Sequence, residues 1–254
     1  MSDADIVFLI RGLTREKRHW EGFDEKLQES LPNKKVICLD LPGFGDNIED
    51  RSPLSIKKIA EYVLNLKTFK EYSGQKKSLV GLSLGGMVSL EMASLDPDDF
   101  ESIVIINSSQ RYKTPFHKRI NFLQLPRLFF LFLFNWVSQR ERLILKLTTN
   151  TKYDSQVPKK WEQFYFEKPF KKRSALFQTL AGGGFSLKSK RESLKSKKGL
   201  VLVALKDRLV HPVSSEMIAK VLEWPIERHK DGGHDLPYDD ALWVIDKIKK
   251  HLNV

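Results

Sequence analysis

A serine flanked on both sides by glycine is the feature of this chain best suited to covalent chemistry. Residues 81–85 read Gly-Leu-Ser-Leu-Gly, with Ser83 at the centre. A short apolar run precedes this pattern, and a run with helical periodicity follows it. At a sharp turn between a strand and a helix, a serine hydroxyl is exposed and can attack a carbonyl carbon. The alternative is an ordinary serine in a glycine-rich turn.

The small residues around Ser83 fit the steric demands of such a turn. The serine backbone is strained there and other segments pass close beside it, so a side chain at position 81 or 85 would collide with them. Gly86 allows the next helix to pack tightly. We expect that helix to begin at Leu84 and to stop at Asp96-Pro97, with its free N–H groups directed at whatever Ser83 attacks.

A nucleophilic serine needs a base that takes its proton and an acid that orients the base. Asp207 follows a strand expected at residues 200–205, and His234 follows a short strand expected at residues 226–229. Both positions lie after the carboxyl ends of strands, at the rim of the sheet where Ser83 is also expected. The residues therefore have the order serine, aspartate, histidine along the chain.

Other titratable residues compete for these two roles. Five histidines are interpreted as surface, strand or packing residues: His19, His117, His211, His229 and His251. Asp235, beside His234, is interpreted as a helix-capping or loop residue. Asp40 could in principle reach a histidine, but the Leu-Pro-Gly sequence after it favours a turn.

Short apolar runs alternate with helical patterns, as in parallel α/β proteins. The strands are expected at residues 7–10, 36–39, 78–80, 103–106, 200–205 and 226–229. Besides the helix after Ser83, helices are expected at about residues 20–30, 55–69, 212–222 and 241–252. The length of 254 residues suits one large α/β domain with an inserted cap.

The interval between the fourth and fifth strands, residues 108–198, is too long for a simple crossover. Its apolar stretch at residues 122–137 is too interrupted for a membrane span, because Pro126, Arg127 and Asn135 lie within it. We expect an inserted helical cap here, with residues 1–107 and 199–254 forming the core. A helix on a membrane surface is the alternative. Side chains that would make a pocket under the cap apolar are Phe122, Leu128, Phe129, Phe132 and Trp136.

The positive charge is concentrated in this same interval. The whole chain has a net charge of +11, yet residues 111–198 hold 21 Lys and Arg against 5 Asp and Glu, and the rest is mildly acidic. This segment is either a solvated lysine-rich face or a surface that steers acidic substrates, acidic carrier proteins or anionic lipids. A nucleic-acid-binding module would predict salt-dependent binding of nucleic acid, a partner that we do not expect.

The single cysteine and the first residues give further expectations about disulfides and cellular location. Cys38 lies in an apolar run, so a buried thiol is expected, and a disulfide within the chain is impossible. Residues 1–5 lack the layout of a signal peptide, which favours a cytoplasmic location. No pattern suggests a metal, nucleotide or flavin site, so no cofactor is expected.

Four segments together resemble the α/β-hydrolase family over essentially the whole chain: residues 81–86, 40–45, 206–210 and 233–234. The resemblance implies that Ser83 is the nucleophile, that His234 is the general base and acid, and that Asp207 is the orienting acid. It also implies an oxyanion hole formed by the backbone N–H groups of Leu84 and Leu13. The fold implied is a minimal, mostly parallel six-stranded sheet flanked by helices, without the two extra strands with which many members begin.

Arg11 departs from the pattern of the family, which usually has a histidine at this position. The change leaves the N–H of Leu13 intact, because the backbone supplies it. The guanidinium is either structural, bonded to loop carbonyls, or it contacts an acidic group of the substrate.

The resemblance implies a carboxylesterase-like serine hydrolase (EC 3.1) that cleaves a small ester or thioester, possibly acidic or carrier-linked, through an acyl-enzyme on Ser83. Members with an aspartate nucleophile are excluded, because serine occupies the turn. The same triad serves carbon–carbon bond hydrolases, lyases, peroxidases and acyltransferases, and fold and triad do not separate these. A catalytically silent binding protein is a further alternative.

Overall fold

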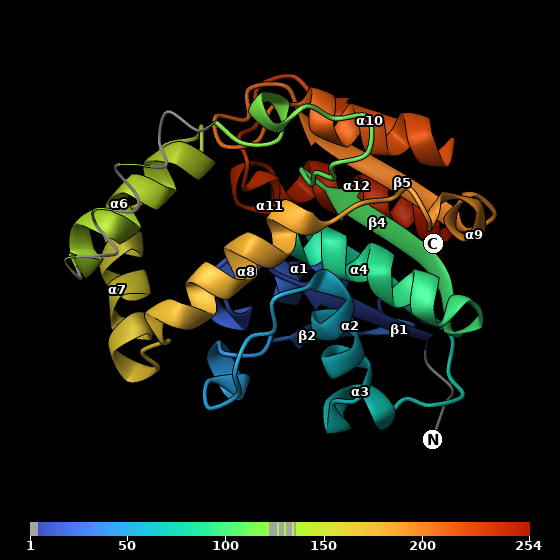
Figure 1. The fold of residues 1–254 in the computed structure, drawn as a ribbon, viewed down its shortest axis with the longest axis horizontal. Coiled ribbons are helices and arrows are strands. Elements are labelled where there is room, and N and C mark those ends of the chain that lie inside the picture. The colour runs from blue at the N-terminus through green and yellow to red at the C-terminus, as the bar shows by residue number, and fades with distance from the viewer. Residues whose placement is uncertain (1–4, 122–125, 127–129, 131–133, 135) are drawn as a thin grey trace.

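Six parallel strands form the centre of the protein, in the order β2-β1-β3-β4-β5-β6 (Figure 1). The computed structural model describes residues 5–121, 126, 130, 134 and 136–254. The strands are β1 (Asp5–Ile10), β2 (Lys34–Leu39), β3 (Lys77–Leu82), β4 (Phe100–Ile106), β5 (Lys198–Ala204) and β6 (Ile226–His229). Every neighbouring pair is parallel. The predicted six-stranded sheet is confirmed, and it is parallel throughout.

Helices cover both faces of this sheet. One face packs against α1 (Phe23–Ser30), α11 (Leu236–Asp239) and α12 (Ala241–Leu252). The other packs against α2 (Ile56–Leu64), α3 (Lys67–Lys70), α4 (Leu84–Leu95), α9 (Arg191–Lys195) and α10 (Val213–Leu222). Short 3₁₀ turns lie at η1 (Lys17–Trp20), η2 (Gly45–Asn47), η3 (Pro97–Asp99) and η4 (Phe116–Lys118).

The apolar runs seen in the sequence are strands buried on both sides. In β1, Ile6 and Phe8 pack into the cluster with α2 and α4, whereas Val7 and Leu9 pack into the cluster with α1 and α12. Successive side chains of a strand point to opposite faces, so a strand between two helical layers has to be apolar at every position. The core is therefore two apolar layers that share one sheet.

The helix expected over residues 55–69 is two helices, which corrects the prediction. Ser55 begins α2 by accepting a hydrogen bond from the Lys58 N–H at 3.3 Å. Asn65 ends it, because its side-chain amide donates to the Glu61 carbonyl at 2.8 Å. Asparagine competes in this way for backbone groups and favours helix ends.

The long interval between β4 and β5 contains four α-helices within its described part: α6 (Val137–Thr148), α7 (Val157–Glu167), α8 (Lys172–Gly184) and the short α9. Figure 1 shows α6 and α7 to one side of the sheet, with α8 running back from them toward α4. After α8, Phe185, Leu187 and Leu194 are buried in the main core cluster. The end of the interval therefore packs with the core.

The predicted pocket residues at positions 122, 128, 129 and 132 lie outside the described residues. Trp136 is 48% exposed, and its ring contacts those of Phe130 and Phe134. Over the described ranges, none of the helices combines the length and the apolar character that crossing a membrane requires.

Cys38 is half-buried rather than fully buried, because β2 is an edge strand. Its Sγ lies 3.6 Å from a carboxylate oxygen of Asp24. Burial, and then the charge of Asp24, raises the pKa of the Cys38 thiol. The thiol therefore stays protonated, which agrees with the expectation of an unreactive cysteine.

Candidate active site

Ser83 occupies a strained turn between β3 and α4. Its backbone has φ 57° and ψ −116°, in a region that residues other than glycine rarely adopt. The Ser83 N–H donates to the Ile106 carbonyl at 2.9 Å, and the Ser83 carbonyl accepts from the Ser108 hydroxyl at 2.7 Å. Helix α4 begins at Leu84, as the sequence predicted. Residues at the end of β4 therefore fix the backbone of Ser83 through these two hydrogen bonds.

The two glycines of the pattern are sterically required. A Cβ at Gly81 would lie 2.5 Å from the Gly85 carbonyl oxygen, and a Cβ at Gly85 would lie 2.0 Å from the Ile10 carbonyl oxygen. Carbon and oxygen atoms do not approach so closely without moving the backbone. The turn therefore sits directly against the end of β1, as the sequence argument required.

His234 and Asp207 form a hydrogen-bonded pair near the carboxyl ends of the strands. The His234 Nδ1 lies 2.7 Å from Asp207 Oδ2, and both side chains are largely buried. A carboxylate only accepts hydrogen bonds, so Nδ1 carries the hydrogen and Nε2 is available as a base. The other carboxylate oxygen of Asp207 accepts from the N–H groups of Leu209 and Val210, each at 2.8 Å.

The loop that carries His234 is fixed from two sides. The Asn107 amide donates to the carbonyls of Gly233 and His234 at 3.1 and 2.9 Å, and its oxygen accepts from the Ala204 N–H at 2.8 Å. From the side of α6, the Thr148 carbonyl accepts from the Asp235 N–H at 2.7 Å. Asn107 thus joins the end of β4 both to the histidine loop and to β5.

Ser83 Oγ and the His234 ring are not joined by a hydrogen bond in the described part of the chain. Such bonds are often long in a protein without substrate and shorten when substrate is bound. The hydrogen bond between His234 and Asp207 is therefore formed, whereas a hydrogen bond between Ser83 and His234 is not.

Two backbone N–H groups beside Ser83 are available to a ligand. Leu84 is the first residue of α4, so its N–H has no partner within the helix. Leu13 follows Gly12, where an added Cβ would lie 3.6 Å from Ser83 Oγ. Among the described residues, neither N–H is recorded with a hydrogen-bond acceptor. Both groups therefore remain candidates for the oxyanion hole that the sequence predicted.

Arg11 bonds to a carboxylate of the chain itself rather than to loop carbonyls. Its two terminal nitrogens donate to both carboxylate oxygens of Asp235 at 2.9 and 2.6 Å, and the two side chains are 4% and 5% exposed. Its guanidinium also lies over the Trp20 ring, 4.8 Å from the ring centre. Such a bidentate pair occupies both terminal nitrogens of the guanidinium. Asp235 was interpreted from the sequence as a helix-capping or loop residue; its pair with Arg11 joins the loop after β1 to the loop that carries His234.

The competing acids and bases have structural partners of their own. Asp40 accepts from the N–H groups of Lys17 at 2.7 Å and Asp46 at 2.9 Å, which agrees with a turn role. Burial raises the pKa of Asp40 to about 6. His229 lies 3.2 Å from an Asp240 oxygen with its ring against Trp243, and the His211 ring accepts from the Val213 N–H.

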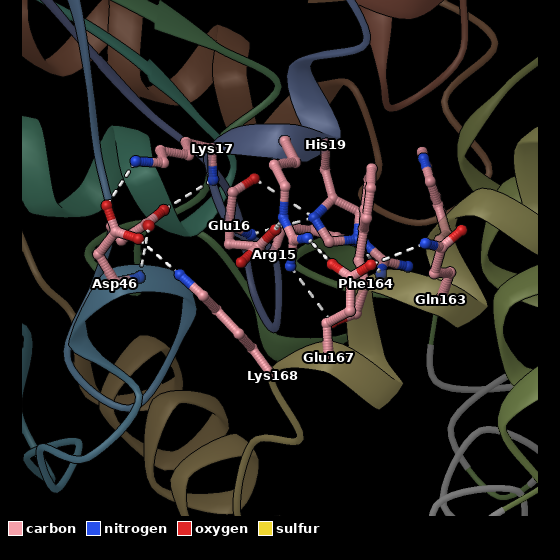
Figure 2. Close-up of polar contacts among 12 residues, drawn as sticks. Arg15, Glu16, Lys17, His19, Asp46, Gln163, Phe164, Glu167 and Lys168 are labelled. Carbon is pink, nitrogen blue, oxygen red and sulfur yellow. Dashed lines mark hydrogen bonds and ion pairs between the residues drawn. The ribbon is translucent and has the colours of Figure 1, made fainter.

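Charged contacts join the core to α6 and α7. The buried Arg15 donates to Glu141 of α6 at 2.7 Å, Arg18 pairs with Glu167 of α7, and Lys168 bonds to Asp46 at 2.6 Å. Figure 2 shows Arg15 and His19 beside Phe164 and Glu167 of α7. A cavity of about 20 Å³ lies at this junction, enough for about one water molecule.

His19 also lies at this junction. Its ring meets those of Trp161 and Phe164 edge to face, with ring centres 5.1 and 5.4 Å apart. Burial lowers the pKa of His19 well below its ordinary value, and the charge of Arg15 lowers it further. The neutral ring is therefore a packing residue, as the sequence suggested.

Sequence reasoning did not identify the residues that hold these loops together. Asn107, Ser108 and Gln178 each bond to a segment far away in the chain. No local pattern marks such partners. The position of Asn107, directly after a buried strand, is the one signal that could have drawn attention to it. Within the described residues, no group of three or more His, Cys, Asp or Glu side chains could hold a metal ion.

A family model described as the alpha/beta hydrolase family matches residues 6–247. The biotin biosynthesis bifunctional protein BioHC of Teredinibacter turnerae is 30% identical over 108 residues, which cover 41% of this chain and 17% of that protein. A pimeloyl-(acyl-carrier protein) methyl ester esterase of Pseudoalteromonas atlantica is 30% identical over 106 residues, 41% of this chain and 38% of the relative. The matches thus span less than half of either relative.

A solved structure has the same fold over the whole chain. The crystal structure of a membrane phospholipase A, described as a bacterial virulence factor, superposes with a TM-score of 0.78. It is 20% identical, and the match covers 100% of this chain and 80% of that one. At this identity the likeness shows the fold alone.

Proposed function

The chain belongs to the alpha/beta hydrolase family, and we propose that it is a serine hydrolase that cleaves an ester or thioester. The observation that carries the proposal is the buried His234–Asp207 pair, with its 2.7 Å hydrogen bond, at the same sheet edge as the strained Ser83. An oriented histidine and a serine at one edge of the sheet are the groups that acyl transfer requires.

In the proposed reaction, Ser83 Oγ attacks the carbonyl carbon while His234 Nε2 takes the hydroxyl proton. Asp207 keeps the ring oriented and stabilises the positive charge that forms on it. The N–H groups of Leu13 and Leu84 stabilise the negative oxygen of the tetrahedral intermediate. His234 returns the proton to the leaving alcohol or thiol, and water then releases the acyl group by the same steps in reverse order.

We further propose that residues 108–198 include a helical cap over Ser83. Support comes from α8, where a Cβ added at Gly182 would lie 2.9 Å from the Leu84 side chain. The carbonyls of Gly182 and Gly183 also accept hydrogen bonds from Arg119 at 2.8 and 2.7 Å. These glycines belong to the last turn of α8.

The substrate class is proposed from the relatives and from the charge of the cap. One relative is named for an ester carried on an acyl-carrier protein, and the cap of this chain is strongly basic. Opposite charge raises the local concentration of an acidic substrate or of an acidic carrier. A small or carrier-linked ester is therefore the substrate class to test first.

A chain-length series of p-nitrophenyl esters and acyl thioesters tests the proposal. The wild type should hydrolyse at least one of them, and Ser83→Ala should lose several orders of magnitude in kcat while staying folded. Retention of more than about a tenth of the activity by Ser83→Ala would refute the role of Ser83. If no ester is cleaved although Ser83 reacts with serine-directed probes, one of the other chemistries of this triad becomes the better assignment.

A further inference from the structure

One face of α8 contacts two loops and the start of α4. Ser174, Gln178 and Gly182 are spaced four residues apart and therefore lie along one stripe of the helix. Ser174 lies against Gly43, Gln178 bonds to Thr14, and Gly182 lies against Leu84. All three contact residues of α8 are buried. The stripe thus spans the loop after β2, the loop after β1 and the start of α4.

The Thr14 contact falls on a strained turn. The Arg15 N–H donates to the Gly12 carbonyl at 3.2 Å and closes a turn in which Thr14 has φ 58°. A positive φ at the third residue of a turn is the position of glycine or asparagine. For a β-branched residue it is a true outlier, and such a conformation persists only when the surroundings enforce it.

Gln178 of α8 contacts this strained turn directly. Its Oε1 accepts a hydrogen bond from the Thr14 N–H at 3.1 Å, and the side chain is fully buried. Its Nε2 has no hydrogen-bond partner among the described residues. A buried amide with an unsatisfied donor costs stability, whereas an apolar side chain of similar size would fill the space without that cost. The contact with the turn, rather than packing, therefore explains why an amide side chain occupies this buried position.

We propose that Gln178 is a positioning residue that holds the turn of residues 12–15, and with it the Leu13 N–H, in the geometry needed to bind the oxyanion. This inference rests on the proposed function of the site. It assigns to α8 a role beyond covering the serine, because closure of the cap then completes the oxyanion hole. Without Gln178, Thr14 would relax to a negative φ and the peptides beside Leu13 would rotate.

The test compares Gln178→Leu with Thr14→Gly and with the double variant. Removal of an oxyanion donor costs ~10²–10³ in kcat, so misalignment of one should cost less, about 10-fold, with KM little changed. Thr14→Gly alone sets the reference rate for the double variant, because glycine adopts positive φ freely. In the double variant, Thr14→Gly should restore most of the lost kcat. Gln163→Leu is the matched control, because the Gln163 amide donates to Glu167 at 2.7 Å within α7.

Two further readouts separate this inference from the proposed function. Hydrogen exchange at the Thr14 amide should accelerate in Gln178→Leu and not in Gln163→Leu, whether or not the protein is an enzyme. Labelling by a serine-directed fluorophosphonate should be slowed about 10-fold by Gln178→Leu, in line with kcat. Failure of the wild type to label would count against the proposed function alone. An unchanged kcat, a change in KM only, or a loss of kcat that Thr14→Gly does not restore would overturn the role of Gln178.

Discussion

The sheet and the segment that we propose as a cap are held together by different forces. Around the sheet, two extensive apolar clusters bury β1, β3, β4 and β5 from both faces. In α6 and α7 the described apolar clusters are small, such as Leu143 with Leu147, or Leu145 with Trp161 and Phe164. The contacts that join these helices to the core include ion pairs of Arg15, Arg18 and Lys168.

This difference predicts which part of the molecule can move. Loss of the core contacts would unfold the domain, because burial of apolar surface is the main source of stability. The partly exposed ion pairs of Arg18 and Lys168 contribute only ~0–1 kcal/mol each and are screened by salt, whereas the buried Arg15–Glu141 pair costs more to break. Contacts of this kind can open without global unfolding. We therefore assign the chemistry to residues held by the sheet, and access and selectivity to the cap.

The largest expected effect comes from the base. His234→Ala should lower kcat by several orders of magnitude, as Ser83→Ala does, because members of a triad act as a unit. His229→Ala is the matched control, a histidine of the same region that pairs with Asp240, and its kcat should change little. Steady-state kinetics of the two variants, with circular dichroism to check folding, make the comparison. Equal losses at both positions would remove the special role of His234.

Asp207→Asn should have the next largest effect, a loss of ~10³–10⁴ in kcat without unfolding. An amide at this position cannot stabilise the protonated ring and favours the wrong tautomer. Asp40→Asn, at a buried carboxylate that accepts only backbone N–H groups, is the control. If Asp207→Asn keeps its kcat while Asp40→Asn loses it, the acid has been assigned to the wrong residue.

Charge on the cap should have a smaller effect, and only for some substrates. Replacement of the exposed Lys171, Lys172 and Arg173 by glutamine should lower kcat/KM for an anionic ester several-fold at low salt. The effect should fade above ~0.1 M salt, where the screening length is ~10 Å, and a neutral ester of equal length should not respond. The control is the exposed core set Lys26, Lys67 and Lys70. Identical responses of the two esters would mean that the basic face is only solvated.

The smallest expected effect is on stability below neutral pH. The pKa of His19 is lowered in the folded state. Below the ordinary histidine pKa of ~6.5, His19 therefore binds a proton more readily in the unfolded chain than in the folded one. Stability is therefore lost as the pH falls through 6.5, by at most ~1.4 kcal/mol per pH unit. The midpoint of thermal unfolding between pH 7.5 and 5.5 should fall ~2–4 °C further in the wild type than in His19→Gln. Equal shifts would show that His19 does not titrate in this range.

Local patterns were sufficient for the sheet and for the three proposed triad positions. The strands could be predicted because each lies between two helical layers and is apolar throughout, and the turn at Ser83 because its glycines have no substitute. The contacts from Arg11 to Asp235 and from Gln178 to Thr14 could not, because they join residues 224 and 164 positions apart. The break between α2 and α3 was missed because one asparagine outweighed an amphipathic pattern.

The most direct test of the account is covalent labelling of Ser83. Wild-type protein treated with a fluorophosphonate should gain one adduct, and peptide mass spectrometry should place it on Ser83. His234→Ala should label far more slowly and His229→Ala at the wild-type rate, because His234 activates the serine. An adduct on another residue, or equal labelling rates in the wild type and in His234→Ala, would contradict the assignment of Ser83 as a nucleophile activated by His234.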